Sequence, residues 1–247
     1  MDKRIIRLCA VCVTMLLCAG ILFKTVITYK STPTGNGITA TGSASMDFES
    51  DLIVWRGSFM VYGESLEEAY DKIKAGADLV KEYLQGQQIQ EDEMVFGSVD
   101  ISRKMIPVYD ENGNYTNDRE GGYDLTQSFV VSSDDIDKVA AVSRDISKLI
   151  ASGVELESRN PEYYCTRLDE IKMQLIEAAS ANAKERIDLM AEQAGAAPGK
   201  LMSANLGVFQ ITARNSGTDD YGATGTLDTA SRYKTAMITV RLNYAVR

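Results

Sequence analysis

The sequence predicts an α+β fold in which antiparallel strands pack with about three amphipathic helices. Apolar residues recur at helical spacing in three long segments, at 65–84, 134–153 and 169–195. The segments between them are rich in β-branched and aromatic residues, which is typical of strands. The strand segments mostly follow one another along the chain. This order favours antiparallel hairpins over the crossover connections of a parallel sheet.

The first strands are expected on either side of a polar break at 49–51. Residues 38–48 and 51–63 are both typical of strands, and we predict that they form a hairpin. Four residues of the second segment share one face: Ile53, Trp55, Phe59 and Val61. Trp55 is the only tryptophan of the chain, and its size makes it the expected anchor of the core.

The first two helices carry recognisable boundary signals. Ser65 stands three residues before Glu68, which predicts a capping box, and Gly86 marks the end of this helix. Acidic residues open the segment 134–153, and Gly153 closes it. Alternation through Val95, Val99 and Ile101 predicts the strand between these two helices. Further strands are expected at 123–133, 154–158, 162–168, 201–212 and 232–246.

The third helix is rich in alanine, and Asp169 is expected to cap it. Projected at 100° per residue, its apolar side contains Ile171, Leu175, Ile176, Ala178, Ala179, Ala183, Leu189, Met190 and Ala194. Small side chains let a helix backbone approach a neighbouring element closely, so we predict a packing helix. Arg186 interrupts the apolar side. We expect its guanidinium to reach water or a carboxylate, and the alternative is an ion pair between subunits, which makes Arg186 a candidate oligomer contact.

Residues 1–30 are expected to form a signal anchor or a signal peptide. The run 8–23 is uncharged and apolar, and Arg7 and Lys24 flank it. It is shorter than the about 20 residues that span a bilayer comfortably, but both flanking side chains can extend to the interface. Small residues at 18–20 offer a cleavage site, yet the apolar run continues beyond them, so we expect an uncleaved anchor. The basic N-terminus should stay inside while the rest of the chain crosses the membrane.

The remainder of the chain is expected to be a linker followed by one acidic domain. Residues 31–38 combine Pro, Gly and short polar residues and predict a linker, and residues 39–247 form the domain. The formal charge is −9 for the chain and −13 for residues 31–247, which hold 21 basic and 34 acidic side chains. Nucleic-acid binding depends on clustered Lys and Arg, so we expect no nucleic-acid partner.

The residue types restrict the chemistry. The chain contains no histidine, which excludes Ser-His-Asp triads and histidine zinc sites. Two carboxylates suffice for glycoside hydrolysis, but no motif distinguishes a pair, so we predict no catalytic residues and no enzyme activity. Cys165 is the only cysteine outside the apolar segment, which excludes a disulfide within the domain. We expect it to be a half-buried strand residue, and an intermolecular disulfide or a reactive thiol is the alternative.

The segment 110–122 resembles a calcium loop only at its start, where Asp110, Asn112 and Asn114 alternate. An EF-hand loop needs Gly at its sixth position and Glu at its twelfth, and here these are Tyr115 and Gly121. We therefore expect no metal and no cofactor, and predict a long solvated connection that turns at Asn112–Gly113.

Taken in order, several of these segments resemble the SIMPL-domain family. The resemblance covers nearly all of residues 39–247. It rests on "ATGSASMDFESDLIVWRGSF", "GQQIQEDEMVFGSVDI", "GYDLTQSFVV" followed by "DIDKVAAVSRDISKLIASGV", and above all "ANAKERIDLMAEQAGAAPGKLMSANLG". The chain departs from the family in its extended 110–122 loop and in Arg186, which stands where a small residue is usual.

The resemblance implies an α+β protein of the bacterial cell envelope, with a single inner-membrane anchor and the domain in the periplasm. It also implies a non-enzymatic scaffold that self-associates, since some members form ring-shaped, channel-like homo-oligomers, and a link to envelope or oxidative stress. We therefore expect an interaction module that contacts the inner membrane through residues 8–23. A small-molecule or peptide binding module is the alternative, and a carboxylate-dependent envelope hydrolase is a third reading.

Overall fold

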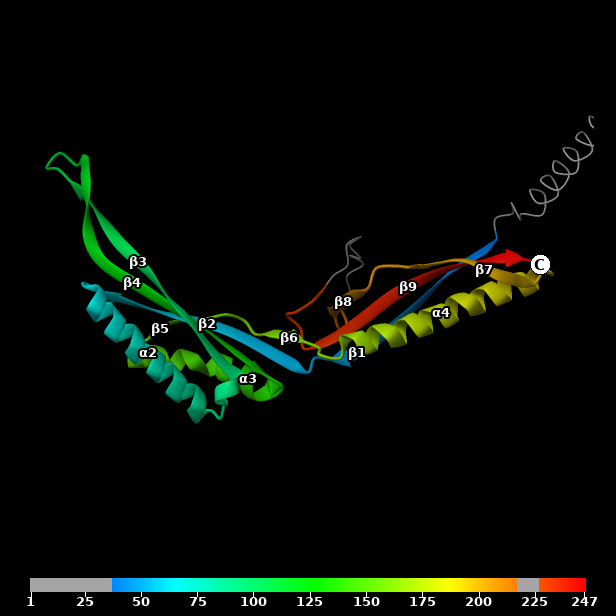
Figure 1. Cartoon of the computed structure of the whole chain (residues 1–247), viewed down its shortest axis with the longest axis horizontal. Coiled ribbons are helices and arrows are strands. Elements are labelled where there is room, and N and C mark those ends of the chain that lie inside the picture. The colour runs from blue at the N-terminus through cyan, green and yellow to red at the C-terminus, as the bar shows by residue number, and fades with distance from the viewer. Residues whose placement is uncertain (1–36, 217–226) are drawn as a thin grey trace, which may run out of the picture. The chain divides into compact units, whose positions relative to one another are not determined.

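The computed structural model describes residues 37–216 and 227–247. The predictions for the anchor at 1–30 and for most of the linker lie outside these residues. The described chain divides into two compact units (Figure 1). Of the described residues, the smaller unit contains 37–43, 177–207 and 239–247, and the larger contains 44–176, 208–216 and 227–238.

Antiparallel sheets and three α-helices make up the described chain, which confirms the predicted α+β class. The helices are α2 (Leu66–Gly86), α3 (Ile136–Asp145) and α4 (Leu168–Gln193), with short 3₁₀ helices η1 (Glu91–Glu93) and η2 (Ile146–Ser152). The strands are β1 (Ile38–Glu49), β2 (Leu52–Gly63), β3 (Met94–Tyr109), β4 (Tyr115–Ser133), β5 (Glu155–Ser158), β6 (Glu162–Tyr164), β7 (Pro198–Leu206), β8 (Gln210–Ala213) and β9 (Tyr233–Val246). One sheet has the order β3-β4-β2-β5, with β6 also paired to β2. The other has the order β1-β9-β7, with β8 paired to β9.

The predicted hairpin of the first two strands is wrong, because β1 and β2 belong to different sheets. At the polar break, the chain leaves the sheet of β1 and enters the sheet of β2. The Ser50 N–H donates to the Arg232 carbonyl oxygen, and the Asp51 N–H donates to the Tyr164 carbonyl oxygen, each at 3.0 Å. These bonds satisfy the backbone at the break with partners other than a hairpin neighbour.

Large side chains fill the core of the larger unit. Trp55, Phe59 and Phe129 are fully buried, as predicted for Trp55, and the rings of Trp55 and Phe129 meet edge to face with centroids 5.2 Å apart. Phe129 lies directly opposite Gly57 in the β2–β4 ladder, and a Cβ at Gly57 would come within 2.4 Å of the Phe129 ring. The glycine therefore provides the space that this ring occupies.

The helices of the larger unit follow the predicted boundaries with one change. The Ser65 side chain accepts a hydrogen bond from the Glu68 N–H and so caps α2, as predicted. The segment predicted as one helix at 134–153 changes to a 3₁₀ helix at Ile146, and Gly153 closes it in the left-handed conformation. Because a 3₁₀ turn advances fewer residues than an α turn, Ile150 leaves the predicted buried face and is exposed.

The predicted loop at 110–122 is mostly strand. Only residues 110–114 turn, with Gly113 at φ 81° as predicted, and β4 begins at Tyr115. Cross-strand pairing continues from Val108–Asn117 through Met105–Glu120. The polar composition of this segment indicated a loop, but a strand that faces water on both sides also accommodates polar residues.

The alternation in β3 predicted the strand but not its buried face. Val95 and Ile101 are exposed, whereas Met94 is buried and Phe96 and Val99 pack against the core. The pairing with β4 shifts register between Phe96 and Val99. This bulge moves the later residues to the other face, which simple alternation does not reveal.

The alanine-rich helix packs against β1 in the smaller unit. Ala179, Ala183, Ile187 and Ala191 are fully buried. A Cβ at Gly42 would lie 2.2 Å from the Ala179 carbonyl oxygen and 2.3 Å from the Ala183 nitrogen, so the two backbones are in direct contact. This confirms the close-approach interpretation of the alanines.

The buried stripe of α4 differs in part from the projected one. Ala178, Leu189, Met190 and Ala194 are exposed, whereas Ile187 is buried. The buried positions recur every four residues, so they drift around the helix axis relative to a fixed 100° projection. Contact with a twisted sheet requires such a drift.

Candidate functional site

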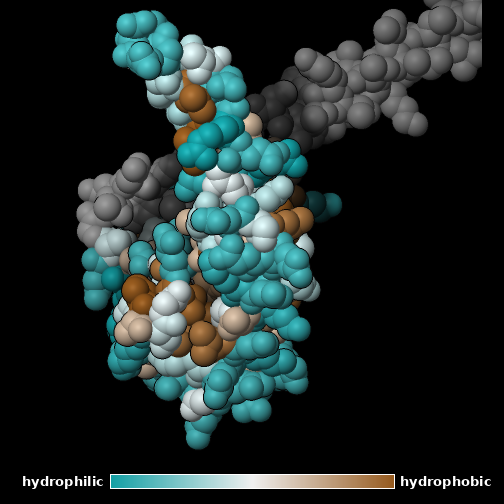
Figure 2. Space-filling view, turned by 90° about the vertical axis from the view of Figure 1, so that its left-hand side faces the viewer, coloured by the Kyte–Doolittle hydropathy of each residue, from teal (hydrophilic) through white to brown (hydrophobic). Residues whose placement is uncertain are grey.

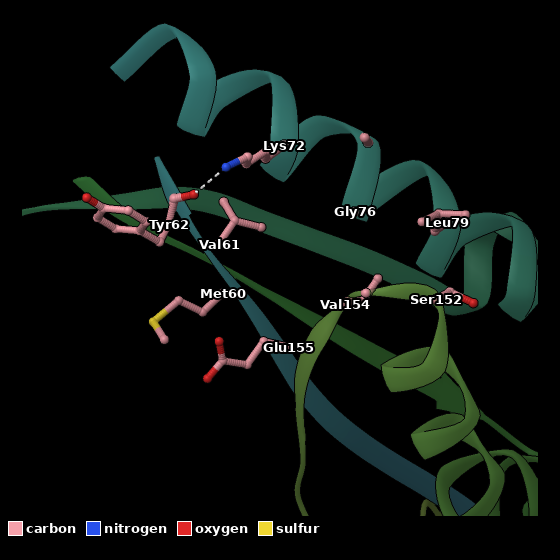
Figure 3. A pocket seen from close by; sticks show the side chains of 11 residues that line it. Met60, Val61, Tyr62, Lys72, Gly76, Leu79, Ser152, Val154 and Glu155 are labelled. Carbon is pink, nitrogen blue, oxygen red and sulfur yellow. Dashed lines mark hydrogen bonds between the residues drawn. The ribbon is translucent and has the colours of Figure 1, made fainter. Parts of the chain in front are cut away.

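A groove in the larger unit, which we call the α2–β2 groove, is the first candidate site. It lies between α2, the last residues of β2 and the junction of η2 with β5, and has a volume of about 440 Å³ (Figure 3). Its lining includes Met60, Val61, Leu79 and Val154. Figure 2 faces this end of the unit and shows apolar side chains gathered among hydrophilic ones.

An open sheet edge borders this groove. β5 pairs with β2 only as far as Met60, and Gly153 turns the chain away from the sheet. Backbone groups of alternate strand residues point to the same side. The Arg56 carbonyl accepts from the Arg159 N–H on the β5 side, so the Tyr62 N–H and carbonyl also face this side. Lys72 Nζ of α2 donates to the Tyr62 carbonyl oxygen at 3.0 Å (Figure 3).

The groove contains few ionisable groups. Glu155 is the only carboxylate in its lining. Lys72 also forms an ion pair with Glu68 at 2.6 Å, and the hydrogen bond from Lys72 holds the pKa of Glu68 below its usual value. The Tyr62 hydroxyl donates to the Gly121 carbonyl oxygen at 2.7 Å. A glycosidase needs two converging carboxyls, one with a raised pKa, and this lining does not supply them.

A second candidate site is the ribbon, by which we mean residues 104–122 of β3, β4 and their turn. β4 pairs with β2 only from Tyr123 onward, so the ribbon extends beyond the sheet as two strands (Figure 1). Five successive residues of β3 are apolar: Met105, Ile106, Pro107, Val108 and Tyr109. Because successive side chains of a strand alternate between faces, both faces of the ribbon carry apolar groups.

The apolar groups of the ribbon are accessible to solvent. Met105, Tyr109 and Tyr115 are 48%, 59% and 57% exposed. The rings of Tyr109 and Tyr115 meet edge to face near the turn, with centroids 6.3 Å apart. The turn is held by Asp110, whose carboxylate accepts from the Asn112 and Asn114 N–H groups at 2.9 and 2.8 Å. These hydrogen bonds, that from Asn114 first, lower the pKa of Asp110, so the alternating polar residues serve the turn.

Arg186, the predicted oligomer contact, is exposed in the smaller unit and uses part of its guanidinium on β1. Its Nη1 donates to the Thr41 carbonyl oxygen at 3.0 Å, and Asn182 Oδ1 accepts from the Ser43 N–H at 3.3 Å. These two side chains of α4 occupy backbone groups of the β1 edge, a common way to protect an edge strand. A cleft of about 320 Å³ beside Arg186 is lined by Leu189 and Met190. The contact of Arg186 between subunits stays a prediction.

Other reactive side chains do not converge in the described chain. Cys165 is half-buried just after β6, and burial raises the pKa of its thiol. Among residues 37–216 and 227–247, the carboxyls with a shifted pKa are all shifted downward: Asp51, Glu68, Glu91, Glu93, Asp110, Asp137 and Glu162. The same residues contain no group of three or more Cys, Asp or Glu that could hold a metal ion.

Sequence reasoning found Arg186 but missed the groove and the ribbon. The groove depends on where β5 ends relative to β2, and pairing between distant segments leaves no local sequence signal. The ribbon had a signal, because five successive apolar residues precede a turn and polar residues capable of pairing follow it.

Fold and sites together define an α+β protein with a surface groove and an exposed apolar ribbon. The family model described as "SIMPL: Protein of unknown function (DUF541)" matches residues 38–243, and the chain belongs to this family. This confirms the resemblance seen in the sequence. A comparison with functionally curated proteins finds no match. In the described part of the chain, none of the helices combines the length and apolar character needed to cross a membrane.

Proposed function

We propose that this chain is a non-enzymatic interaction module of the bacterial cell envelope that self-associates through the ribbon. The observation that carries the proposal is the apolar run at residues 105–109, in which Met105, Pro107 and Tyr109 are exposed and Ile106 and Val108 are half-buried. A two-stranded ribbon is only marginally stable in water, and an exposed apolar face is best accommodated when a partner covers it. A second copy of the chain is such a partner, because most soluble oligomers are assemblies of identical chains.

The proposal includes a tether to the inner membrane. The apolar run at 8–23 would provide a single-pass anchor, and the basic residues before it would remain in the cytoplasm. The domain would then lie on the periplasmic side, or be released there if the N-terminus is cleaved. A tether confines the chains to two dimensions and raises their effective concentration, which favours self-association.

The proposal is tested by the mass of the full-length chain in a non-ionic detergent, measured by light scattering after size-exclusion chromatography over a concentration series. We expect a discrete assembly for the wild type. The double variant Met105→Glu and Tyr109→Glu should shift the mass to the monomer, because a charge at an apolar contact is costly to desolvate. Met173→Glu, at an exposed methionine of α4, is the matched control and should leave the assembly intact. A wild type that stays monomeric throughout the series contradicts the proposal.

A second candidate function is peptide binding at the α2–β2 groove. The observation that favours it is the orientation of the Tyr62 backbone groups toward the open edge beside Val61 and Leu79. An extended peptide could add a strand there and place an apolar side chain in the groove. We expect an apolar fluorescent dye bound to the wild type to be displaced by a valine-rich extended peptide. The variant Leu79→Asp should lose dye binding, and equal binding by this variant would count against the groove.

A further inference from the structure

A polar pocket lies on the sheet face opposite the core of the larger unit. Residues 159–161 leave the β2 edge between β5 and β6, and Pro161 has no N–H with which to continue the pairing. The pocket that results has a volume of about 430 Å³. Its lining is polar or charged throughout: Arg56, Arg159, Asn160, Glu162 and Tyr164.

The strand register brings these side chains to one face. Val54 pairs with Glu162 and Leu52 pairs with Tyr164, so the side chains of these four residues lie on the same side of the sheet. Arg56 follows Val54 by two residues and shares that side. Trp55 lies between them and points into the core, where its indole N–H donates to Ser158 Oγ at 3.1 Å.

Part of the hydrogen-bonding capacity of the two guanidinium groups is left over after internal pairing. Arg56 Nη1 forms a salt bridge with Glu162 Oε2, and the Tyr164 hydroxyl donates to the same oxygen at 3.0 Å. The hydrogen bond from Arg56 lowers the pKa of Glu162, which keeps this carboxylate ionised. Arg159 Nε stands 3.9 Å from Glu157 Oε1, too far for a hydrogen bond. The lining holds two guanidinium groups and one carboxylate, and Glu157 beside Arg159 balances the second positive charge, so what the pocket offers a ligand is guanidinium N–H donors.

A second pocket with two arginines shows what makes this one different. Arg214 and Arg232 line a cavity of about 440 Å³, but both are bound to carboxylates at hydrogen-bond distance. Arg214 pairs with Asp47 at 3.1 Å, and Arg232 pairs with Glu49 at 2.7 Å and with Asp137 at 2.5 Å. Those guanidinium groups are engaged by the protein itself, whereas the Arg159 guanidinium has no such bond.

We propose that the pocket formed by Arg56, Arg159, Asn160 and Tyr164 binds a phosphoryl oxyanion, either free or as the head group of a lipid. The planar guanidinium presents donors in a fork that matches two phosphoryl oxygens, and the Asn160 amide offers a further donor. Arg56 uses Nη1 for Glu162, which leaves donors of the same fork for a ligand.

Calorimetric titration of the full-length chain in a non-ionic detergent tests this proposal. The probes are inorganic phosphate and glycerophosphoglycerol, the soluble head group of phosphatidylglycerol, each at constant ionic strength. We expect saturable binding of at least one probe, with a Kd on the order of 1 mM. Binding of phosphate alone assigns a free anion, and stronger binding of glycerophosphoglycerol assigns a lipid head group.

The variant Arg159→Ala should weaken the affinity about tenfold through loss of a charge-assisted hydrogen bond. Because the Arg159 side chain is 70% exposed, this variant is expected to fold normally. Arg241→Ala, at an exposed arginine of β9, is the matched control and should bind like the wild type. The proposal would be overturned if neither probe binds to the wild type. Equal binding by Arg159→Ala and the wild type would also overturn it.

Discussion

The helix–sheet contacts of the two units are built in opposite ways. In the larger unit, aromatic side chains such as Phe59 and Phe129 fill the space between helix and sheet. In the smaller unit, α4 meets β1 through Ala179, Ala183 and Gly42, with the two backbones touching. The first contact should therefore be sensitive to loss of volume and the second to gain of volume.

The largest expected effect is the loss of an aromatic ring from the larger unit. Phe129→Ala should lower the free energy of unfolding by about 3–5 kcal/mol, because it leaves a cavity between Trp55 and Phe96 and uncovers Gly57. Urea unfolding followed by Trp55 fluorescence measures this. Tyr70→Ala, at an exposed tyrosine of α2, is the control and should cost well under half as much. Equal losses at the two positions would contradict the core described for this unit.

A gain of side-chain volume tests the packing of the smaller unit. Ala183→Leu should destabilise the protein by about 1–3 kcal/mol, because the added atoms have no space between α4 and β1. Ala181→Leu adds the same atoms to the exposed side of the helix and should change stability little. Thermal unfolding of the two variants checks the difference. An unchanged midpoint for Ala183→Leu would refute the close contact.

A smaller, pH-dependent effect is expected at the junction between β1 and β2. Burial by itself raises the pKa of Asp51, but hydrogen bonds from Thr166 and Arg167 outweigh it, and the net shift is downward. A carboxyl with a lowered pKa in the folded state stabilises the fold above its ordinary pKa of about 4, and this stabilisation is lost as the pH falls toward the folded-state value.

Asp51→Asn should accordingly cost about 1 kcal/mol at pH 7, and its difference from the wild type should shrink below pH of about 4. Denaturant unfolding at a series of pH values measures this. Asp78→Asn, at an exposed position of α2, provides the control. A cost at Asp51 that is constant with pH would mean that the charge plays no part in the junction.

The smallest effect is expected at Arg186. Arg186→Ala removes an exposed hydrogen bond to the Thr41 carbonyl oxygen and should cost less than about 1 kcal/mol. The same variant tests Arg186 as an oligomer contact, because a subunit contact would show as a change in assembly mass rather than in stability. Light scattering together with thermal unfolding separates these two roles.

The sequence was sufficient for elements whose signals are local. Ser65 and Gly153 marked helix boundaries, and the alanines of α4 indicated a close contact. Distant pairing was not predictable in the same way. The partner of β1 is β9, nearly two hundred residues later in the chain, so local composition alone suggested a hairpin with β2. The bulge in β3 is similarly hidden from the sequence: Met94 and Phe96 face the core before it and Val99 faces the core after it, so Val95 is exposed.

The candidate sites were less predictable than the fold. Arg186 could be selected from the sequence because it interrupts the apolar side of α4. The α2–β2 groove and the Arg56–Arg159 pocket both arise where short strands stop pairing with β2, and those ends are set by the register of the whole sheet. Neither site contains a residue type or motif that predicts the site from the sequence.

The most direct test of self-association through the ribbon is hydrogen exchange of the full-length chain, measured by mass spectrometry at a low and a high protein concentration. We expect amides of residues 104–122 to exchange more slowly at the high concentration, because a second copy covers them. Peptides from α2 serve as the internal reference and should exchange equally at both concentrations. If the mass shows an assembly but the exchange of the ribbon amides does not depend on concentration, the contact between copies lies elsewhere. This result would contradict self-association through the ribbon.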